Sequence, residues 1–499
     1  MMTRTKKAKP KHNLKLLAVL GGPSIAILTA ILLPNSLALE GRAVAGIALW
    51  MAFWWMTEAV PIPVTSLLPI VLFPAVGAGT IGEVTSPYAG SVVFLVLGGV
   101  LLGLATERSN LHVRIALWTI KMVGTRPAQM VFGMMLASAF ISAWVSNTAT
   151  AVIMIPIATS VLSMVGEIDE RAADKKFAAS LLLGVAYGVT IGSTATLIGQ
   201  PPMPLMKAYL LETFGYDMSF GRWMLVGVPW AVAMLVIAWA VLTKIVFRSD
   251  VAEIAGGKEM IERELGKLGP LTSSERRVSA IFGAAIFAWV VIPLLTDMTD
   301  LGNVIPIIAK IGDTQVAIAA AILCFVIPAG DTKSGQGSHL LEWEAAKEVP
   351  WGLLLLFGGG LSLSAMFTAT GLSEWVGDQV GALRSVPEWT LLLVVMLVAL
   401  VLTELTSNTA TAAAFLPIFG SVAVGIGMDP LLMTVTVTLA VCSAYMLPVA
   451  TPSNAVAFGS GQIEISQMVR AGVWLNLISI VVILIVLYTL VPLVFGAGI

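Results

Sequence analysis

The chain has 499 residues, of which 58% are hydrophobic and only 11% are charged. Ordinary soluble domains carry about a quarter charged residues, so this composition excludes a soluble globular protein and indicates an all-α, polytopic membrane protein. The formal net charge of −1 argues against nucleic acid as a partner, because phosphate binding needs an excess of Lys and Arg.

The chain opens with a basic segment, residues 1–13, in which Lys and Arg have no acidic neighbour. Such a flank before an apolar stretch is typical of a cytoplasmic end in the cell membrane. We expect four spans to follow, at residues 14–33, 43–60, 64–76 and 91–106. The basic residues that come next, between 107 and 126, fit a return to the cytoplasm.

Residues 131–161 are apolar except for a polar phrase near their centre, Ser146-Asn147-Thr148. Because charged residues follow, as in a cytoplasmic loop, we interpret this segment as a re-entrant helical hairpin. The alternative is one long span whose polar residues face a neighbouring helix. Residues 177–211 then predict a span broken at 199–203, where two prolines remove backbone donors, and residues 224–246 predict a return.

Residues 244–277 form the longest polar segment and predict a cytoplasmic linker between two halves, residues 14–243 and 278–499. In the second half we expect spans at 278–295, 316–327 and 353–370, a hairpin at 390–420, a broken span at 431–459 and a last span at 472–495. The chain would then have eleven spans and two re-entrant hairpins, with an extracytoplasmic C-terminus.

The two halves repeat each other motif by motif. Ser-Asn-Thr-Ala-Thr occurs at 146–150 and at 407–411, an offset of 261 residues. Gly-rich tetrapeptides that begin at 98 and 358 are 260 residues apart, and breaks that begin at 199 and 450 are 251 apart. Since corresponding elements would enter from opposite faces, the sequence predicts an inverted-topology repeat, which is typical of secondary transporters with a site near the membrane midplane.

The polar phrases suit both an anion and a small cation. At a hairpin tip, free backbone N–H groups and helix N-termini favour a carboxylate, whereas carbonyl, hydroxyl and amide oxygens favour a hard cation such as Na⁺. Asn147 and Asn408 offer both kinds of group. Neither phrase nor either break contains Lys, Arg or His, so co-bound Na⁺ is the simplest source of positive charge for a dianion. The alternative is that these side chains only join helices through hydrogen bonds.

Three segments carry a resemblance to a known family: Trp55-Met56-Thr57-Glu58-Ala59-Val60-Pro61, the doubled phrase, and residues 446–461. Together they resemble the divalent anion/sodium symporter (DASS) family, dicarboxylate transporter branch, over nearly the whole chain. The resemblance implies a homodimeric elevator carrier in the lipid bilayer that co-transports Na⁺ with dicarboxylates, citrate or sulfate.

The resemblance also implies which residues bind. The expected substrate contacts are Asn147, Thr148, Gln200, Pro201, Asn408, Thr409, Thr451 and Pro452. The first sodium site is expected at Ser142, Ser146, Asn147 and the backbone near Gly199, and the second at Thr403, Thr406, Asn408 and the backbone near Ala450. Family members commonly have Gly-Thr/Ser-Pro-Pro-Asn at the first break, whereas this chain has Gln200 and Met203, so its preference for substrate size is open.

The leading hypothesis is sodium-coupled symport of a small dicarboxylate such as succinate, malate or fumarate. The alternatives within the class are a sodium-independent dicarboxylate exchanger and a carrier for sulfate or citrate. An ion channel is a hypothesis from another class, but opposed hairpins favour an occluded site over a continuous pore. We expect no enzymatic activity, because no nucleophile–base pair, metal cluster or phosphate loop stands out in the sequence.

Two charged residues near these motifs have open roles. Glu404 lies three residues before the second phrase, and could tune a cation or proton site or make a structural hydrogen bond. Lys207 follows the first break, and could approach an anion or extend toward the membrane interface.

Overall fold

The computed structural model describes residues 12–124, 126–168, 175–248, 257–298, 310–330 and 339–496. These residues are largely helical, and among them the one strand-like feature is an isolated bridge between Pro328 and His339. The predicted all-α class is confirmed. Residues 1–11 of the basic segment and residues 249–256 of the predicted linker lie outside the described residues.

The first half contains helices that follow the predicted order. They are α1 His12–Leu32, α2 Leu39–Thr57, α3 Ile62–Thr65, α4 Leu68–Ala75, α5 Ile81–Thr85, η1 Ser86–Ala89, α6 Ser91–Arg108, α7 Leu111–Val123, α8 Pro127–Ser142, α9 Asn147–Ile168, α10 Lys175–Gly192, η2 Ser193–Ala195, α11 Pro202–Phe214 and α12 Phe220–Ala240, with a π-helical turn Val241–Val246. The predicted span at 64–76 is divided into α3 and α4.

The second half begins after an amphipathic helix in the linker, α13 Gly257–Leu268, which an ion pair between Lys121 and Glu262 (3.2 Å) joins to α7. The later helices are α14 Ser273–Met298, α17 Asp313–Val326, η4 Trp343–Glu348, α18 Trp351–Ala369, α19 Leu372–Gln379, η5 Gly381–Ser385, α20 Glu388–Leu405, α21 Asn408–Ile426, α22 Pro430–Val441, α23 Pro452–Gly459, α24 Ile465–Tyr488 and α25 Leu490–Phe495.

Among the described residues, eight helical segments are long and apolar enough to cross a membrane, and six shorter apolar helices accompany them. The eight include both arms of the second hairpin, α20 and α21, whereas α8 and α9 of the first hairpin are among the shorter ones. Both hairpins exist as pairs of helices in contact. Their re-entrant depth and the count of eleven spans stay predictions.

The order of helices from α6 to α12 recurs from α18 to α24. The helices α6 and α18 begin at Ser91 and Trp351, which are 260 residues apart. A residue with positive φ follows each of them, Asn110 at 59° and Gly371 at 70°, and these two are 261 residues apart. The repeated order supports the predicted repeat, and its inversion stays a prediction.

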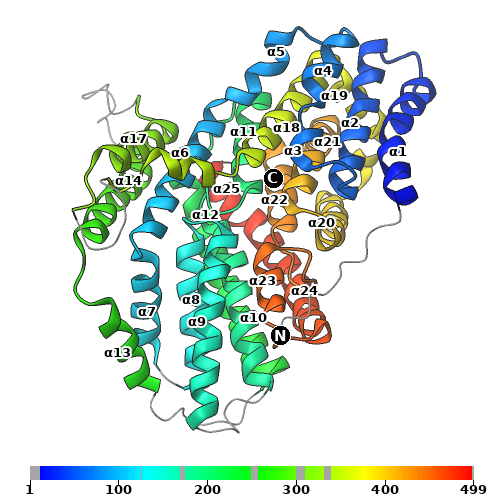
Figure 1. Ribbon diagram of the computed structural model, residues 1–499. Helices are drawn as coiled ribbons and strands as arrows, with labels where there is room; N and C mark the ends of the chain where they lie inside the picture. The colour runs from blue at the N-terminus through cyan, green and yellow to red at the C-terminus, as the bar shows by residue number, and fades with distance from the viewer. Residues whose placement is uncertain are drawn as a thin grey trace.

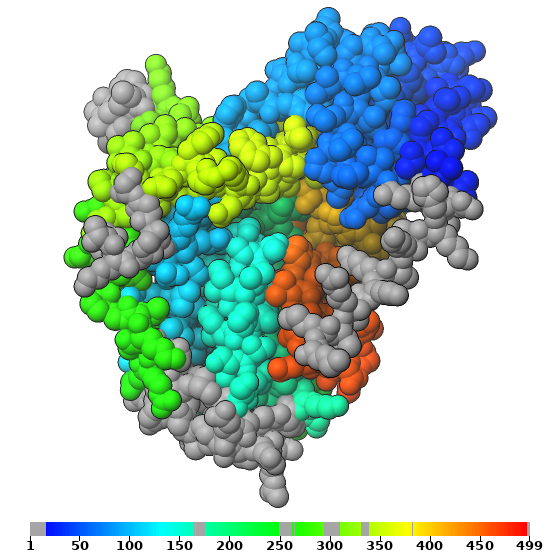
Figure 2. Space-filling view, viewed as in Figure 1, coloured from blue at the N-terminus to red at the C-terminus, as the bar shows by residue number. Residues whose placement is uncertain are grey.

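The two halves interlock instead of forming separate bodies. Figure 1 shows α8, α9 and α10 grouped on one side of the molecule, with α23 and α24 of the second half beside them, and α23 packs against both α9 and α10. In Figure 2 the cyan surface of the first hairpin borders the orange surface of the second half. The broken span of one half therefore packs against the hairpin of the other.

Glycines let α10 approach α8 closely. A Cβ atom at Gly188 would lie 2.6 Å from the carbonyl oxygen of Met135, and one at Gly192 would lie 2.2 Å from the backbone of Ala139. Any side chain at these positions would push the helices apart, as at other small-residue contacts between membrane helices. This contact places the backbone of α10 against the C-terminal end of α8, next to the tip of the first hairpin.

Candidate functional site

The first tip lies between the end of α8 at Ser142 and the start of α9 at Asn147. The Ser142 hydroxyl lies 3.2 Å from Oδ1 of Asn147 and 2.5 Å from the carbonyl oxygen of Val189 on α10, and both polar side chains are buried. Ser146 accepts a hydrogen bond from the backbone N–H of Ala149 (3.2 Å), which caps the start of α9. Three oxygens from three segments therefore meet at this tip.

The second tip repeats this arrangement. The Thr403 hydroxyl lies 2.7 Å from Oδ1 of Asn408 and 2.8 Å from the carbonyl oxygen of Val441 on α22, and the two side chains are buried. Ser142 and Thr403 are 261 residues apart, as are the two asparagines. The tips thus have the same geometry as well as the same sequence.

Each set of three oxygens, which we call the oxygen trio, contains more acceptors than protons. A hydroxyl has one hydrogen, which cannot serve both an amide oxygen and a backbone carbonyl in full. Neutral oxygens gathered in this way are the ligands that transporters use for Na⁺. The three ligand oxygens of each trio therefore fit a small monovalent cation.

Not every predicted sodium ligand faces its trio. The backbone of Gly199 lies at the first tip, since a Cβ there would be 3.0 Å from the carbonyl oxygen of Ser142. Thr406 instead bonds to the carbonyl of Leu402 and to the hydroxyl of Thr411, both at 2.8 Å. Ala450 is buried and its N–H donates to the carbonyl of Leu447 (3.2 Å).

Both breaks begin earlier in the chain than the sequence analysis predicts. The first unwound stretch lies between Ala195 and Pro202, and the second between Val441 and Pro452. Pro202 and Pro452 each occupy the first position of the next helix, where a missing N–H costs nothing. The prolines therefore start α11 and α23, and the predicted breaks at 199–203 and 450–454 are corrected accordingly.

The predicted substrate residues differ in exposure. Thr148 and Pro452 are exposed, Pro201 and Thr409 are half-buried, and Gln200 and Thr451 are buried. Oε1 of Gln200 lies 2.8 Å from the Ser193 hydroxyl, so this long side chain folds back on η2. The accessible members could meet an anion directly, whereas Gln200 is held by its own half.

Glu404 has a structural set of partners that the sequence analysis left open. Its buried carboxylate accepts hydrogen bonds from the backbone N–H groups of Tyr445, Met446 and Leu447 at 2.8–3.1 Å, and from Nδ2 of Asn476 at 2.7 Å. Charge-assisted bonds of this kind are strong inside a low-dielectric environment. The carboxylate therefore ties the second hairpin to the unwound stretch of its broken span.

Lys207 lies at neither tip. Its buried ammonium pairs with Asp313 at the start of α17 (2.5 Å) and with the exposed Asp217 (3.4 Å). Asp313 also accepts a hydrogen bond from the backbone N–H of Phe220 (3.0 Å). The lysine is thus part of a buried ion pair, a role that the sequence analysis did not consider.

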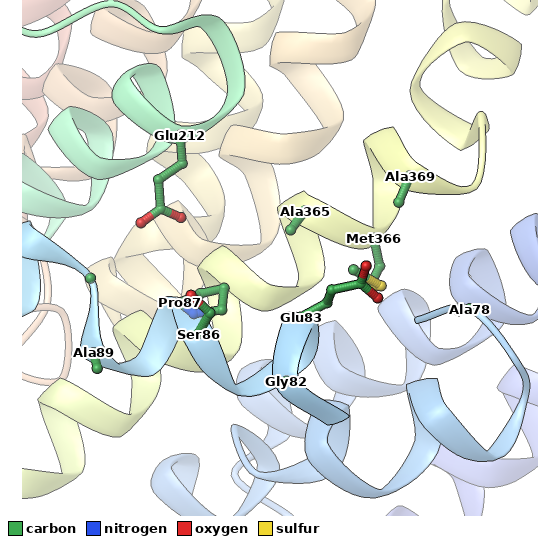
Figure 3. Close-up of a pocket in the computed structure, with 11 residues that line it drawn as sticks. Ala78, Gly82, Glu83, Ser86, Pro87, Ala89, Glu212, Ala365, Met366 and Ala369 are labelled. Carbon is green, nitrogen blue, oxygen red and sulfur yellow. The ribbon is translucent and has the colours of Figure 1, made fainter. Parts of the chain in front are cut away.

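A cavity among the described residues lies away from both tips. It has a volume of about 840 Å³ and is lined by residues of α5, η1, α18 and the end of α11. Figure 3 shows Glu212 on one side of it, and Glu83 next to Met366 on the other. None of the predicted site residues lines this cavity.

Sequence reasoning missed the backbone carbonyls of the two trios, those of Val189 and Val441, because every residue type has a carbonyl group. The glycines of α10, spaced four residues apart at 184, 188 and 192, were a signal that could have placed this helix against the first hairpin. Thr190 and Ser453, which join α10 to α23, were also missed.

Paired hairpins, broken helices and an all-helical apolar fold define a multi-pass membrane transporter. The chain belongs to the family described as "Sodium:sulfate symporter transmembrane region", which matches residues 11–495. The family predicted from the sequence is therefore confirmed. As a member of a transporter family, the protein is not an enzyme.

A curated relative agrees with this family assignment, and two solved structures share the fold alone. The chain is 40% identical to the sodium-dependent dicarboxylate transporter SdcS of Staphylococcus aureus (strain USA300), over 100% of this chain and 95% of that protein. Two solved structures share the fold at 15% identity. The YdaH transporter of Alcanivorax borkumensis has a TM-score of 0.59, covering 90% of this chain and 98% of its own, and MtrF of Neisseria gonorrhoeae has 0.61, covering 99% and 96%.

Proposed function

We propose that this protein is a sodium-coupled symporter of small dicarboxylates such as succinate, malate or fumarate. The observation that carries the proposal is the pair of equivalent oxygen trios, at Ser142–Asn147 and Thr403–Asn408, in tips whose sequence has no basic residue. The 40% identity to a sodium-dependent dicarboxylate transporter supports the substrate class.

The physical reason for coupling is electrostatic. A dianion loses several kcal/mol or more of solvation free energy when it leaves water for a membrane interior, unless positive charge accompanies it. One Na⁺ at each trio supplies that charge beside Asn147 and Asn408, whose amide Nδ2 groups are then directed to the substrate. Thr148, Thr409 and Thr451 donate hydroxyl protons to the carboxylates, and Pro201 and Pro452 shape the wall around them.

The same proposal includes the remaining site residues and the transport cycle. The backbone of Gly199 completes the first sodium site, Ser146 and Thr406 stabilise the two tips through their own hydrogen bonds, Ala450 lies in the second unwound stretch, and Gln200 limits the size of the substrate. The two hairpins and broken spans move together as an elevator domain in a homodimer embedded in the lipid bilayer. The N-terminus is cytoplasmic and the C-terminus extracytoplasmic.

Uptake into proteoliposomes tests the proposal. Purified protein should accumulate radiolabelled succinate when Na⁺ is high outside, and should do so at least tenfold more slowly when choline replaces Na⁺. Equal uptake in both media would remove sodium coupling and favour an exchanger.

Counterflow then identifies the substrate class. Vesicles preloaded with malate or fumarate should exchange with external labelled succinate, whereas vesicles preloaded with sulfate or citrate should exchange poorly. The opposite ranking would assign the protein to sulfate or citrate, and the family description names sulfate among its substrates.

A further inference from the structure

A chain of three hydroxyl groups connects the first half of the protein to a proposed substrate ligand in the second half. The Thr190 hydroxyl on α10 lies 2.9 Å from the Ser453 hydroxyl, which lies 3.0 Å from the hydroxyl of Thr451. Thr190 and Ser453 are fully buried, and Thr451 is 2% exposed. The chain is therefore shielded from water.

The hydrogen-bonding protons of these three hydroxyl groups can be counted. The Thr451 oxygen accepts a hydrogen bond from the backbone N–H of Asn454 (3.2 Å), which leaves one lone pair and one proton. When Ser453 donates to that lone pair, the Thr451 oxygen is saturated as an acceptor, and its proton has no partner within the chain. Thr190 completes the order by donating to Ser453 in place of the carbonyl of Ala186, which lies 3.1 Å away.

We infer that Thr190 and Ser453 are positioning residues that direct the hydroxyl proton of Thr451 toward a carboxylate of the transported anion. When a substrate carboxylate accepts the Thr451 proton, it favours the order in which Thr190 donates to Ser453 and Ser453 donates to Thr451, because successive hydrogen bonds polarise one another. The inference rests on the proposed function and adds two residues to it. Neither residue needs to touch the substrate.

This row of three hydroxyl groups has no equivalent at the other break. Val189 and Val441 hold equivalent places in the two trios, so Thr190 corresponds to Cys442. Pro202 and Pro452 each begin the helix after the break, so Ser453 corresponds to Met203. Neither counterpart has a hydroxyl. The ordered donor at Thr451 therefore distinguishes the two ends of the substrate site, and favours anchoring one carboxylate at the second break.

Isosteric variants test the inference in proteoliposomes. Thr190→Val removes the hydroxyl but keeps the shape, and should raise the KM for succinate about fivefold, the effect of losing one ordered hydrogen bond, with Vmax changed less than about twofold. Thr190→Ser should restore the wild-type KM. Thr436→Val is the matched control, because Thr436 is equally buried and its hydroxyl bonds only to the carbonyl of Leu432 in its own helix (2.7 Å).

Ser453→Ala tests the same chain from its other end, and serves if Thr190→Val does not fold. It should raise the KM as Thr190→Val does, and the double variant should be no worse than either single variant, because both break one chain. An unchanged KM in both single variants, or an equal rise in Thr436→Val, would overturn the inference. Wild-type protein that shows no sodium-dependent uptake would instead defeat the proposed function.

Discussion

The two hairpin tips share one geometry and differ in what supports it. Each joins a hydroxyl, an asparagine and a carbonyl from the neighbouring broken span. The residue that follows the trio hydroxyl differs between the halves. In the second half it is Glu404, whose carboxylate binds the unwound stretch. In the first half it is Ala143, whose backbone carbonyl accepts a hydrogen bond from the Thr196 hydroxyl. The trios, which are proposed to bind the ions beside the substrate, are the same in both halves, whereas the contacts next to them differ.

This difference gives the tips different electrostatic settings. The second tip has a buried negative charge satisfied by backbone N–H groups and Asn476, whereas the first is held by neutral groups. If the trios are sodium sites, the two ions enter unequal environments, and equivalent substitutions should have unequal effects.

Removing the asparagines should have the largest effect. Asn147→Ala and Asn408→Ala each delete an amide oxygen from a trio, so a bound cation would lose one of its three ligands, while the hydroxyl keeps its hydrogen bond to the carbonyl of Val189 or Val441. We expect sodium-dependent succinate uptake to fall at least tenfold in both variants, a loss in the range known for disrupted ion sites. Uptake in proteoliposomes measures it. Normal transport in either variant would remove that trio from the mechanism.

Glu404→Gln should have the next largest effect, on stability. The amide has one acceptor oxygen, and its NH₂ group would face backbone N–H donors, so about 2–3 kcal/mol of folding free energy should be lost. The apparent melting temperature of the detergent-solubilised protein should fall by several degrees. Glu374→Gln, at an exposed carboxylate on α19, is the control and should leave it unchanged. Equal melting temperatures for the two variants would show that the carboxylate does not hold the unwound stretch.

The sequence alone predicted the part of the site that depends on residue type. The repeated phrase placed Asn147 and Asn408, and the spacing of five residues back to Ser142 and Thr403 carried over from the family. The carbonyls of Val189 and Val441 could not be predicted, because they depend on how closely α10 and α22 approach the hairpins.

The breaks were misplaced for a related reason. Proline in an apolar run indicates that a helix is interrupted, but the same ring is favourable at the first position of a helix. Pro202 and Pro452 begin helices, and the unwound backbone lies before them. The partners of Glu404 lie 41–43 and 72 residues away in the chain, so no local pattern identifies them.

Gln200→Thr would give the first break a small hydroxyl side chain of the kind that Thr451 gives the second. The bond to Ser193 is lost and the smaller side chain opens space at the first tip. We expect the ratio of citrate to succinate counterflow to rise about threefold, since one or two methylene-sized changes in a pocket alter discrimination modestly. Gln200→Glu, which keeps the length, should not raise it. A ratio unaffected by Gln200→Thr would mean that this residue does not limit substrate size.

The smallest effect is expected from exchanging one residue between the tips. In the second half, the hydroxyl of Thr406 pairs with the hydroxyl of Thr411 (2.8 Å). In the first half, Val145 stands in the place of Thr406 and Thr150 in the place of Thr411. Because Val145 is apolar, the buried hydroxyl of Thr150 has no hydrogen-bond partner among the described residues. Val145→Thr should therefore stabilise the protein by about 0.5–1 kcal/mol, and Thr406→Val should destabilise it by a similar amount. Melting temperatures of the two variants should shift in opposite directions by a degree or more. A shift in the same direction would mean that the tips are not equivalent in packing, and that their likeness is confined to the oxygen trios.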